Sequence, residues 1–511
     1  MGHPVKIRRG NMQAIVFFAL VSAVLFEAIG TGCGQNEGAP AKKLSQEDEA
    51  AKALSEIHCR SCHAYPSPYL LDRNSWNNVL FSMEVEMKKE GYQIKDEDWF
   101  SIQRYYLSQA PAALPVASAS QKKLDKACAV FQKTDKLSNV EGAIPVSSLV
   151  KYDQASNTLY TGDLDRNLFI FKGSELSQKL QLGTVPIDIL PNQKDGSLDV
   201  LCIGADLMPT QGRGGEIMHI SKDGEQKRIV DFLDRPVQFL RQDFDGDGRE
   251  EFLVSCFGSL VGPLNTGKLT LYTAENGVFK EHKIKEMPGA IKSVTGDFNQ
   301  DGKPDIIALF AQGREFLSLF LNKGNLEFEE KQLLEFPPIH GSNDFELADV
   351  NGDSYPDLIV TNGDNGDNSP VFKPYHGVRI FINDGKFAFS EKFFFPINGA
   401  SKVLARDFDG DQDLDMVVLA MYPNLAAYPQ EALVYFENKG KLDFEASYLE
   451  KEASNRWVLL DAGDVDGDGD LDLVAGTNMM VMSILLPPDI NSKWRQSKET
   501  YAVFENVFNQ K

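Results

Sequence analysis

The chain has 511 residues, a formal net charge of −22 and 42% hydrophobic residues. This length leaves room for more than one domain, and the hydrophobic share argues against a chain that is disordered throughout. The acid excess, with no basic run beyond the first ten residues, argues against a nucleic-acid partner and fits many carboxylates placed to hold cations.

The N-terminus has the pattern of an export signal. A positive head precedes an apolar run over residues 14–29, which is too short and too interrupted for a good membrane span. The run ends in "IGTGCG", which resembles a bacterial lipoprotein cleavage site. Residues 1–32 are therefore predicted to be a signal peptide, Cys33 a lipidated new N-terminus, and residues 33–48 a polar tether. Ordinary cleavage near Cys33 is the alternative. Either reading predicts an exported protein, and lipidation would anchor it on the periplasmic side of a membrane or at the cell surface.

The segment "IHCRSCHA" holds two cysteines followed directly by a histidine. A tetrahedral zinc site would need a second cysteine or histidine pair, and a redox dithiol would be expected near a βαβ pattern; the sequence offers neither. The pattern C-x-x-C-H is the attachment signature of c-type haem. Cys59 and Cys62 are therefore predicted to form thioethers to the haem, with His63 as the proximal iron ligand.

The second axial ligand is expected from the same small domain. Met83 and Met87 lie four residues apart, on one face of a predicted helix. Met83 is the predicted ligand and Met87 the alternative. Ligation by a thioether and an imidazole raises the reduction potential and suits electron transfer. An all-α, cytochrome c-like domain is thus predicted over 49–113, followed by a linker over 114–137.

A motif rich in aspartate recurs five times at intervals of 52 to 58 residues. Its copies are "DFDGDGREE", "DFNQDGKPD", "DVNGDSYPD", "DFDGDQDLD" and "DVDGDGDLD". Each has an oxygen side chain at positions one, three, five and nine, and each runs into an apolar stretch. Alternate side chains of a tight loop can meet at one centre, as Ca²⁺ requires, with a backbone carbonyl serving at position seven. About five calcium sites are therefore predicted. The alternative is that these motifs are acidic surface turns that hold no ion.

The predicted calcium ligands occupy positions one, three, five, seven and nine of each copy. They are Asp243, Asp245, Asp247, Arg249 and Glu251; Asp297, Asn299, Asp301, Lys303 and Asp305; Asp349, Asn351, Asp353, Tyr355 and Asp357; Asp407, Asp409, Asp411, Asp413 and Asp415; and Asp464, Asp466, Asp468, Asp470 and Asp472. The last two copies have full acidic sets and are expected to bind best.

A hairpin signal recurs behind the motifs. "LSLFLNKGNLEF", "VRIFINDGKFAF" and "ALVYFENKGKLDF" each read as an apolar strand, an N-x-G turn and a second strand. One period then holds about four strands, which is the size of a propeller blade. The fold predicted for residues 138–511 is an all-β, seven-bladed propeller whose first and last segments close the ring. Cys202 and Cys256 fall in comparable strands of neighbouring repeats, where a disulfide and two separate thiols both fit.

Residues 138–511 resemble FG-GAP/VCBS repeat proteins, whose propeller blades carry such calcium loops, as in integrin α-subunit heads. The whole chain is similar to exported bacterial proteins that join a C-x-x-C-H segment to such a ring. Their pattern of C-x-x-C-H, a Trp, then "VL" and a Met is matched here by Cys59, Cys62, His63, Trp76, Val79, Leu80 and Met83, with Phe81 and Ser82 where Pro-Asn is common. The resemblance implies architecture more than activity.

Three functions fit these parts. The first is a non-enzymatic electron-transfer lipoprotein whose propeller docks a redox partner protein. The second is a haem c-dependent oxidoreductase whose propeller binds a small molecule or carbohydrate. The third is a ligand-binding or adhesion module. No nucleophile–base pair and no flavin or nicotinamide fingerprint is visible, so the first is favoured. The long connections after each buried strand are expected to form the binding face.

Overall fold

The structure is a computed structural model. It describes residues 44–89, 91–116, 124–205, 214–258, 266–366, 369–479 and 485–508. The predicted signal peptide, the lipidation site at Cys33 and most of the tether lie outside these residues. None of the helices in the described ranges is both long enough and apolar enough to cross a membrane.

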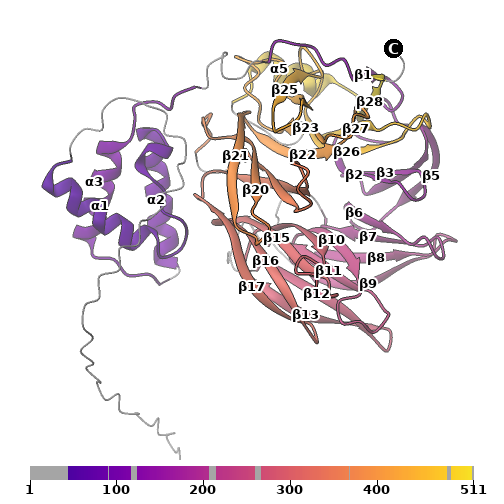
Figure 1. Cartoon of the computed structure of the whole chain (residues 1–511), viewed down its shortest axis with the longest axis horizontal. Helices are drawn as coiled ribbons and strands as arrows, with labels where there is room; N and C mark the ends of the chain where they lie inside the picture. The colour runs from indigo at the N-terminus through magenta and orange to yellow at the C-terminus, as the bar shows by residue number, and fades with distance from the viewer. Residues whose placement is uncertain are drawn as a thin grey trace, which may run out of the picture. The chain divides into compact units, whose positions relative to one another are not determined.

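The helical region consists of α1 (Gln46–Cys59), the short 3₁₀ helix η1 (Pro68–Leu70), α2 (Arg73–Lys89) and α3 (Asp96–Gln109). Ser45 caps α1 by accepting the N–H of Asp48, and Asp72 accepts two N–H groups at the start of α2. Both side chains satisfy donors that a helix N-terminus leaves unpaired. The predicted α domain is present and Figure 1 shows its three helices.

The helices pack through aromatic side chains. Trp76 and Tyr106 are almost fully buried and lie edge to face, with ring centroids 4.6 Å apart. Their polar atoms are also paired, since Trp76 Nε1 donates to the carbonyl of Pro68 and the Tyr106 hydroxyl to that of Pro66, each at 2.7 Å. These two bonds fix the loop that follows the C-x-x-C-H segment onto the helical core.

The remaining chain forms seven four-stranded antiparallel sheets. The first strands of successive sheets contact one another in a closed circle, including the contact of β26 with β2. This arrangement is a seven-bladed β-propeller, as the repeat predicted, and its blades can be followed in Figure 1.

In blades 1 to 6 the strands run outward from the centre in chain order, and in blade 7 the outermost strand is β1 (Phe131–Thr134). Blade 1 has β2 (Ser147–Asp153), β3 (Thr158–Asp163), β4 (Asn167–Lys172) and β5 (Glu175–Gln181); blade 2 has β6 (Pro186–Pro191), β7 (Leu198–Cys202), β8 (Gly215–Ile220) and β9 (Gln226–Leu233); blade 3 has β10 (Pro236–Gln242), β11 (Glu251–Cys256), β12 (Lys268–Glu275) and β13 (Val278–Glu286); blade 4 has β14 (Ala290–Gly296), β15 (Asp305–Gln312), β16 (Arg314–Gly324) and β17 (Glu327–Phe336). Blade 5 has β18 (Ser342–Ala348), β19 (Asp357–Asn362), β20 (Gly377–Asn383) and β21 (Phe389–Pro396); blade 6 has β22 (Ala400–Arg406), β23 (Asp415–Ala420), β24 (Leu433–Asn438) and β25 (Phe444–Tyr448); blade 7 has β26 (Trp457–Gly463), β27 (Asp472–Thr477), β28 (Tyr501–Asn506) and β1.

Blade 7 is completed by a strand from the other end of the chain. β1 (Phe131–Thr134) pairs antiparallel with β28, Phe131 opposite Asn506. The expected ring closure is present, but the boundary predicted at residue 138 is too late, because β1 lies inside the range 114–137 that was expected to be a linker. The short sequence "FQKT" has one buried side chain, Phe131, and its partner strand is distant in sequence, so no local pattern marks it.

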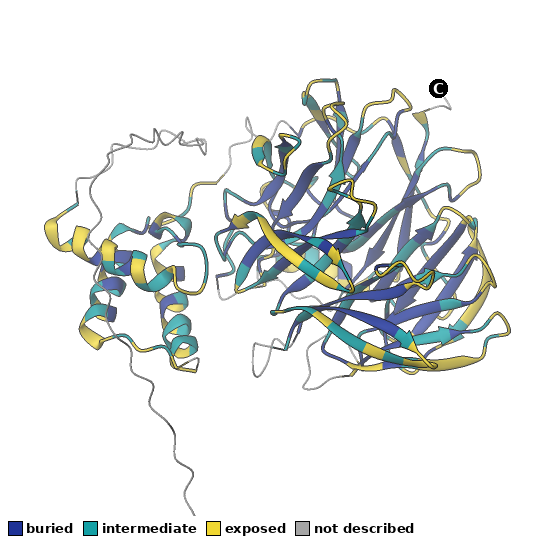
Figure 2. Ribbon diagram, turned by 60° about the horizontal axis from the view of Figure 1, so that its bottom comes forward, coloured by how far each residue is buried: buried dark blue, intermediate teal, exposed yellow. Residues whose placement is uncertain are grey.

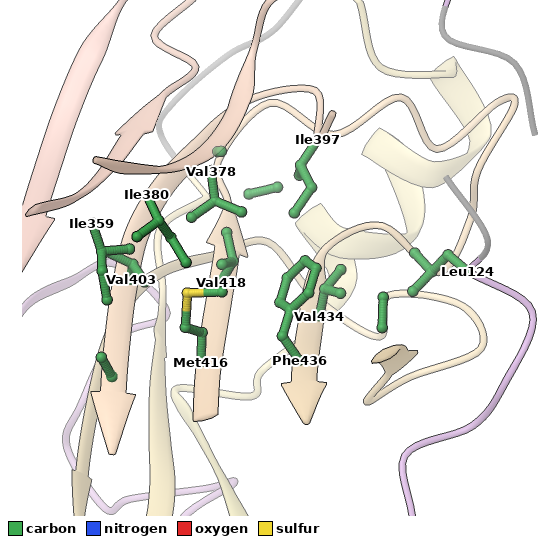
Figure 3. Packing of buried hydrophobic residues seen from close by; sticks show 14 of the residues in the cluster. Leu124, Ile359, Val378, Ile380, Ile397, Val403, Met416, Val418, Val434 and Phe436 are labelled. Carbon is green, nitrogen blue, oxygen red and sulfur yellow. The ribbon is translucent and has the colours of Figure 1, made fainter. Parts of the chain in front are cut away.

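The core lies between the blades. The second strands are buried along both faces, whereas outer strands such as β5 and β13 are largely exposed, as Figure 2 shows. Figure 3 shows one such layer between blades 5 and 6, in which side chains of β19, β20, β22, β23 and β24 interlock. Continuous apolar runs are typical of strands covered on both sides, which is why the stretch after each aspartate motif could be recognised.

A helix that the sequence analysis did not predict, α5 (Pro488–Gln496), lies in the connection between β27 and β28. It buries Trp494, whose Nε1 donates to the carbonyl of Ala453. Cys202 and Cys256 are both fully buried free thiols, so they do not form a disulfide.

Candidate functional site

The C-x-x-C-H segment lies at the end of α1. Cys59 is the last residue of that helix, and Cys62 and His63 follow in the turn beyond it. Cys59 is half-buried and Cys62 exposed, and both are free thiols. Burial raises the pKa of Cys59 to about 11, so this thiol stays protonated at neutral pH. The two cysteines are one helical turn apart and unbridged, as attachment to a single group requires.

His63 has one ring nitrogen in use and one free for a metal. Nδ1 lies 2.9 Å from the carbonyl of Ala64, and because a carbonyl can only accept, Nδ1 carries the proton. This leaves Nε2 with its lone pair. Burial lowers the pKa of the imidazole and so favours the neutral ring, which is the form that binds metal ions.

Met83 and Met87 both lie on α2 and are half-buried. They pack against the same helical core as Cys59. His58, which directly precedes Cys59, is held elsewhere, with Nδ1 3.0 Å from the hydroxyl of Tyr92. The structure therefore brings two free thiols, a neutral imidazole and two thioethers into one small domain. This donor set fits a covalently attached haem.

The five aspartate loops all connect the first and second strands of blades 3 to 7, and so lie on one face of the ring. They share one backbone conformation. The carboxylate at position one accepts N–H groups from later in the loop; Asp407, for example, accepts from Gly410 at 2.7 Å and Gln412 at 3.0 Å. Positions four and six have positive φ in every loop, which glycine adopts most easily. Gln412, with φ 77°, shows that the loop geometry is kept even without glycine.

Three of the loops gather carboxylates closely enough for a metal ion. In each, ligand oxygens of positions one, three and nine lie within 4.8 Å of one another; the sets are Asp243, Asp245 and Glu251; Asp407, Asp409 and Asp415; and Asp464, Asp466 and Asp472. The other two loops have Asn299 or Asn351 at position three. Burial raises the pKa of Asp415 to about 6 and that of Asp472 to about 7. Gathering buried carboxylates without a counter-ion is unfavourable, and a divalent cation would relieve this.

Nearby lysine and arginine side chains distinguish the five loops further. The Arg249 guanidinium pairs with Asp247 at 2.9 Å, and Lys303 Nζ lies 3.2 Å from Asp301, so each of these loops already neutralises one predicted ligand. Lys136 approaches Asp466 at 3.7 Å. Among the described ion pairs, none involves the loops of blade 5 (residues 349–357) or blade 6 (residues 407–415), and of these two only the loop of blade 6 has a full acidic set. This favours blade 6 among the two loops, 407–415 and 464–472, that are expected to bind best.

Position nine has a second role that the sequence analysis missed. In blades 4 to 7 this carboxylate also accepts the N–H of an asparagine on the third strand of its blade, and for Asp415 the partner is Asn438 at 2.9 Å. The same pairing joins Asp305 to Asn322, Asp357 to Asn383 and Asp472 to Asn506. These asparagines are the N of the N-x-G turns in blades 4 to 6, which were interpreted as hairpin signals only. Their recurrence behind the motifs of blades 4 to 7 was the signal available.

Two of these asparagines also connect blades. Asn322 Nδ2 donates to the carbonyl of Phe244 in blade 3 at 2.9 Å, and Asn506 Nδ2 to that of Phe408 in blade 6 at 2.7 Å. Both acceptors stand at position two of an aspartate loop. The cation loops are thus hydrogen-bonded to the neighbouring blade as well as to their own.

The long connections expected to form a binding face lie at the opposite ends of the second strands, and residues 206–213, 259–265, 367–368 and 480–484 of them are outside the described ranges. The described part of the connection after β19 is held by internal bonds. Asn365 Nδ2 donates to the carbonyl of Val371 at 2.9 Å, and the buried Lys373 ammonium binds Asn365 Oδ1.

Comparison with known proteins identifies the repeat. Residues 243–308 and 297–360 match the FG-GAP-like repeat. No curated protein matches the chain. Solved structures that match the chain include the Neurospora crassa Pan2 WD40 domain (12% identity, 70% of this chain and 88% of that chain covered, TM-score 0.40) and the N-terminal domain of Nup159 (10%, 73% and 94%, 0.41). A third is BBS1N, solved in complex with ARL6DN (12%, 74% and 97%, 0.42). The chain is therefore a seven-bladed β-propeller protein that contains FG-GAP repeats.

Proposed function

We propose that this protein is an exported electron-transfer protein with a covalent haem in its helical domain and calcium in its propeller loops. The propeller serves as the scaffold that docks a redox partner. Export, and anchoring through a lipid on Cys33, belong to the same proposal, because haem is attached at C-x-x-C-H motifs outside the cytoplasm.

The donor set around His63 carries the proposal. Cys59 and Cys62 are free and one helical turn apart, His63 keeps Nε2 available, and the core beside them presents two thioethers. Bound haem would supply reversible one-electron chemistry. The chain would hold the haem through thioether bonds formed by Cys59 and Cys62, fix the His63 ring by its hydrogen bond to Ala64, and exclude water with the buried aromatic core.

The deciding experiment is expression of the full chain in a host that matures c-type cytochromes. We expect a coloured protein whose haem stays attached after denaturation, and a mass increase on the peptide that bears both thiols. Replacing Cys59 and Cys62 together by Ala removes the attachment, whereas Cys128→Ala, at a half-buried free cysteine outside the helical domain, leaves it unchanged. A colourless protein with an unmodified peptide would refute the proposal.

The axial ligand is tested by two further variants. We expect Met83→Leu to lower the reduction potential and abolish the spectral signature of methionine ligation, because the soft thioether stabilises reduced iron. Met87→Leu is the matched control on the same helix face and should alter neither property. The reverse outcome would assign the ligand to Met87.

The role of the propeller is supported by its architecture. Rigid rings that display loops at the ends of their strands are binding scaffolds, and this ring has its loops fixed by buried hydrogen bonds. Calcium bound in them would neutralise the gathered carboxylates and hold each loop to its blade. Titration of the chelator-treated protein with Ca²⁺ tests this, with saturable binding and a rise in the unfolding temperature as the expected result.

A further inference from the structure

Seven residues surround the central channel on the face opposite the cation loops. Each one immediately precedes the first strand of a blade, and its carbonyl accepts an N–H from the end of the second strand of that blade. They are Val146, Val185, Arg235, Gly289, Gly341, Gly399 and Arg456. Because first strands line the channel and the cation loops follow them, these residues form a ring at the other mouth. We call this set the mouth ring.

Two arginines interrupt a ring of otherwise small or apolar residues. Three blades have glycine at this position, with φ of 92°, 68° and 76° at Gly289, Gly341 and Gly399. Arg235 occupies the same position with φ 48°, a left-handed conformation that residues with a Cβ rarely adopt. An arginine therefore occupies a position at which the backbone conformation favours glycine.

Arg235 is the mouth-ring residue of blade 3. Its guanidinium stacks on Phe257, 5.3 Å from the ring centroid. Among the described residues, nothing accepts a hydrogen bond from its buried Nε or Nη1. Burial lowers the pKa of Arg235, and the carboxylate of Asp364, in blade 5, partly offsets this effect.

Arg456 reaches the same region from blade 7. It is only 3% exposed and stacks on Tyr422 at 5.3 Å. Nη2 donates to the carbonyl of Met421, and nothing in the described part of the chain accepts from Nε. The Tyr422 hydroxyl and the Asp364 carboxylate both flank Gly366, at 3.6 Å and 3.1 Å from the point where a Cβ would stand. Asp364 and Tyr422 are therefore neighbours, and the ring of Tyr422 also carries the Arg456 guanidinium.

Other arginines of the propeller that are partly or largely buried have carboxylate partners. Arg379 pairs with Glu391 and Arg406 with Glu346, each at 2.8 Å. Arg235 and Arg456 have no such ion pair among the described residues, in a chain whose net charge is −22. Buried guanidinium N–H groups without an acceptor are unfavourable unless an anion supplies one, and their planar fork suits two oxygens of one group.

We propose that the channel mouth binds a small anionic molecule, whose carboxylate or phosphate oxygens accept hydrogen bonds from Arg235 and Arg456. In the described part of the chain, one carboxylate, that of Asp364, acts on Arg235 and none acts on Arg456, and each guanidinium lies over an aromatic ring. Tyr422 and Asp364 stand beside the anion position and would contact a neutral or hydroxyl-bearing part of the ligand. This site is independent of haem and of the cation loops, which lie at the other face.

Isothermal titration of the full chain with inorganic phosphate and, separately, with malonate tests the proposal at constant ionic strength set by sodium chloride. We expect saturable binding of one anion per chain. Tighter binding of phosphate would indicate a phosphate ligand, and tighter binding of malonate a carboxylate ligand. Arg235→Gly installs the residue that three other blades carry, so the fold is expected to persist while affinity falls at least tenfold. Arg166→Gly is the matched control, since Arg166 is exposed and also has a positive φ, of 67°.

Two more variants keep the test decisive if Arg235→Gly does not fold. Arg456→Gln should weaken binding, and Asp364→Asn should strengthen it several-fold by removing the competing carboxylate. Absence of saturable binding of either anion to the wild-type chain would overturn the proposal. So would an affinity that changes less than twofold in all three mouth variants.

Discussion

The hydroxyl of Tyr435 offers a sharp test of the hydrogen bonds that join the position-nine carboxylate to the third strand of its blade. Asp415 is fully buried, and the Tyr435 hydroxyl donates to its Oδ2 at 2.7 Å. The tyrosine ring is itself 2% exposed and packs against Phe131 and Phe408. Tyr435→Phe keeps this packing and deletes one hydrogen bond to a charged acceptor.

The expected loss is about 1.5–3 kcal/mol of unfolding free energy, because hydrogen bonds to charged groups contribute more than neutral ones. With about 2 cal/mol/K of unfolding entropy per residue, a ring of this length loses about 2–4 °C of melting temperature. Calorimetry of the full chain, with and without Ca²⁺, measures this shift.

Tyr501→Phe is the matched control. Tyr501 is also fully buried, but its hydroxyl donates at 3.3 Å to the carbonyl of Gly162, a neutral acceptor. The expected loss there is about 0.5–1.5 kcal/mol. The stabilising role of the hydrogen bond from Tyr435 to the Asp415 carboxylate would be refuted by either of two results. One is a melting temperature of Tyr435→Phe within 1 °C of the wild type, and the other is a loss of unfolding free energy no greater than that of Tyr501→Phe.

Three further predictions concern the ring. Asn322→Ala removes two bonds from Nδ2, to the carbonyls of Phe244 and Pro304, and should cost about 2–4 kcal/mol of unfolding free energy in thermal denaturation; a loss below 1 kcal/mol would contradict the inter-blade role. Burial lowers the pKa of His340 to about 3, so the folded chain keeps this ring neutral while the unfolded chain takes up a proton below pH 6.5. Stability therefore falls by about 1.4 kcal/mol per pH unit below 6.5 from this group. His340→Phe, which preserves the stacking on Tyr375, should remove that part of the slope between pH 6.5 and 5, and equal slopes would count against it. Finally, a chelator should lower the melting temperature, and Asp407→Asn should abolish more of the Ca²⁺-dependent rise than Asp297→Asn; equal effects would show that the ranking of loops is wrong.

The fold was largely predictable because its signal is local and repeated. Blades 4 to 6 each present an aspartate loop, a buried strand and an N-x-G hairpin within one period, so the size of a blade follows from the spacing of Asp243, Asp297, Asp349, Asp407 and Asp464, and the number of blades from the length of the remaining chain. An all-α domain was also predicted over residues 49–113, and the structure has three α-helices there, between residues 46 and 109.

What could not be predicted depends on partners distant in the chain. β1 is recognisable as a strand only when it is seen beside β28. Asn322 is recognisable as a link between blades only when Phe244 is seen next to it. The same holds for Arg235 and Arg456, which have no motif around them and become comparable only when the first strands are superposed as a ring. Cys202 and Cys256 occupy equivalent strands, as expected, but equivalent positions in adjacent blades do not bring two thiols together.

The position of β28 between β27 and β1 has a consequence for biosynthesis. β1 is translated before the other strands of the ring, whereas its partner β28 follows all of them in the chain. A chain truncated before residue 501 leaves β1 without a neighbour and the edge of β27 open, however well the first six sheets have formed. Loss of this one strand therefore exposes backbone hydrogen-bonding groups at two separate strands, which the closed ring keeps paired.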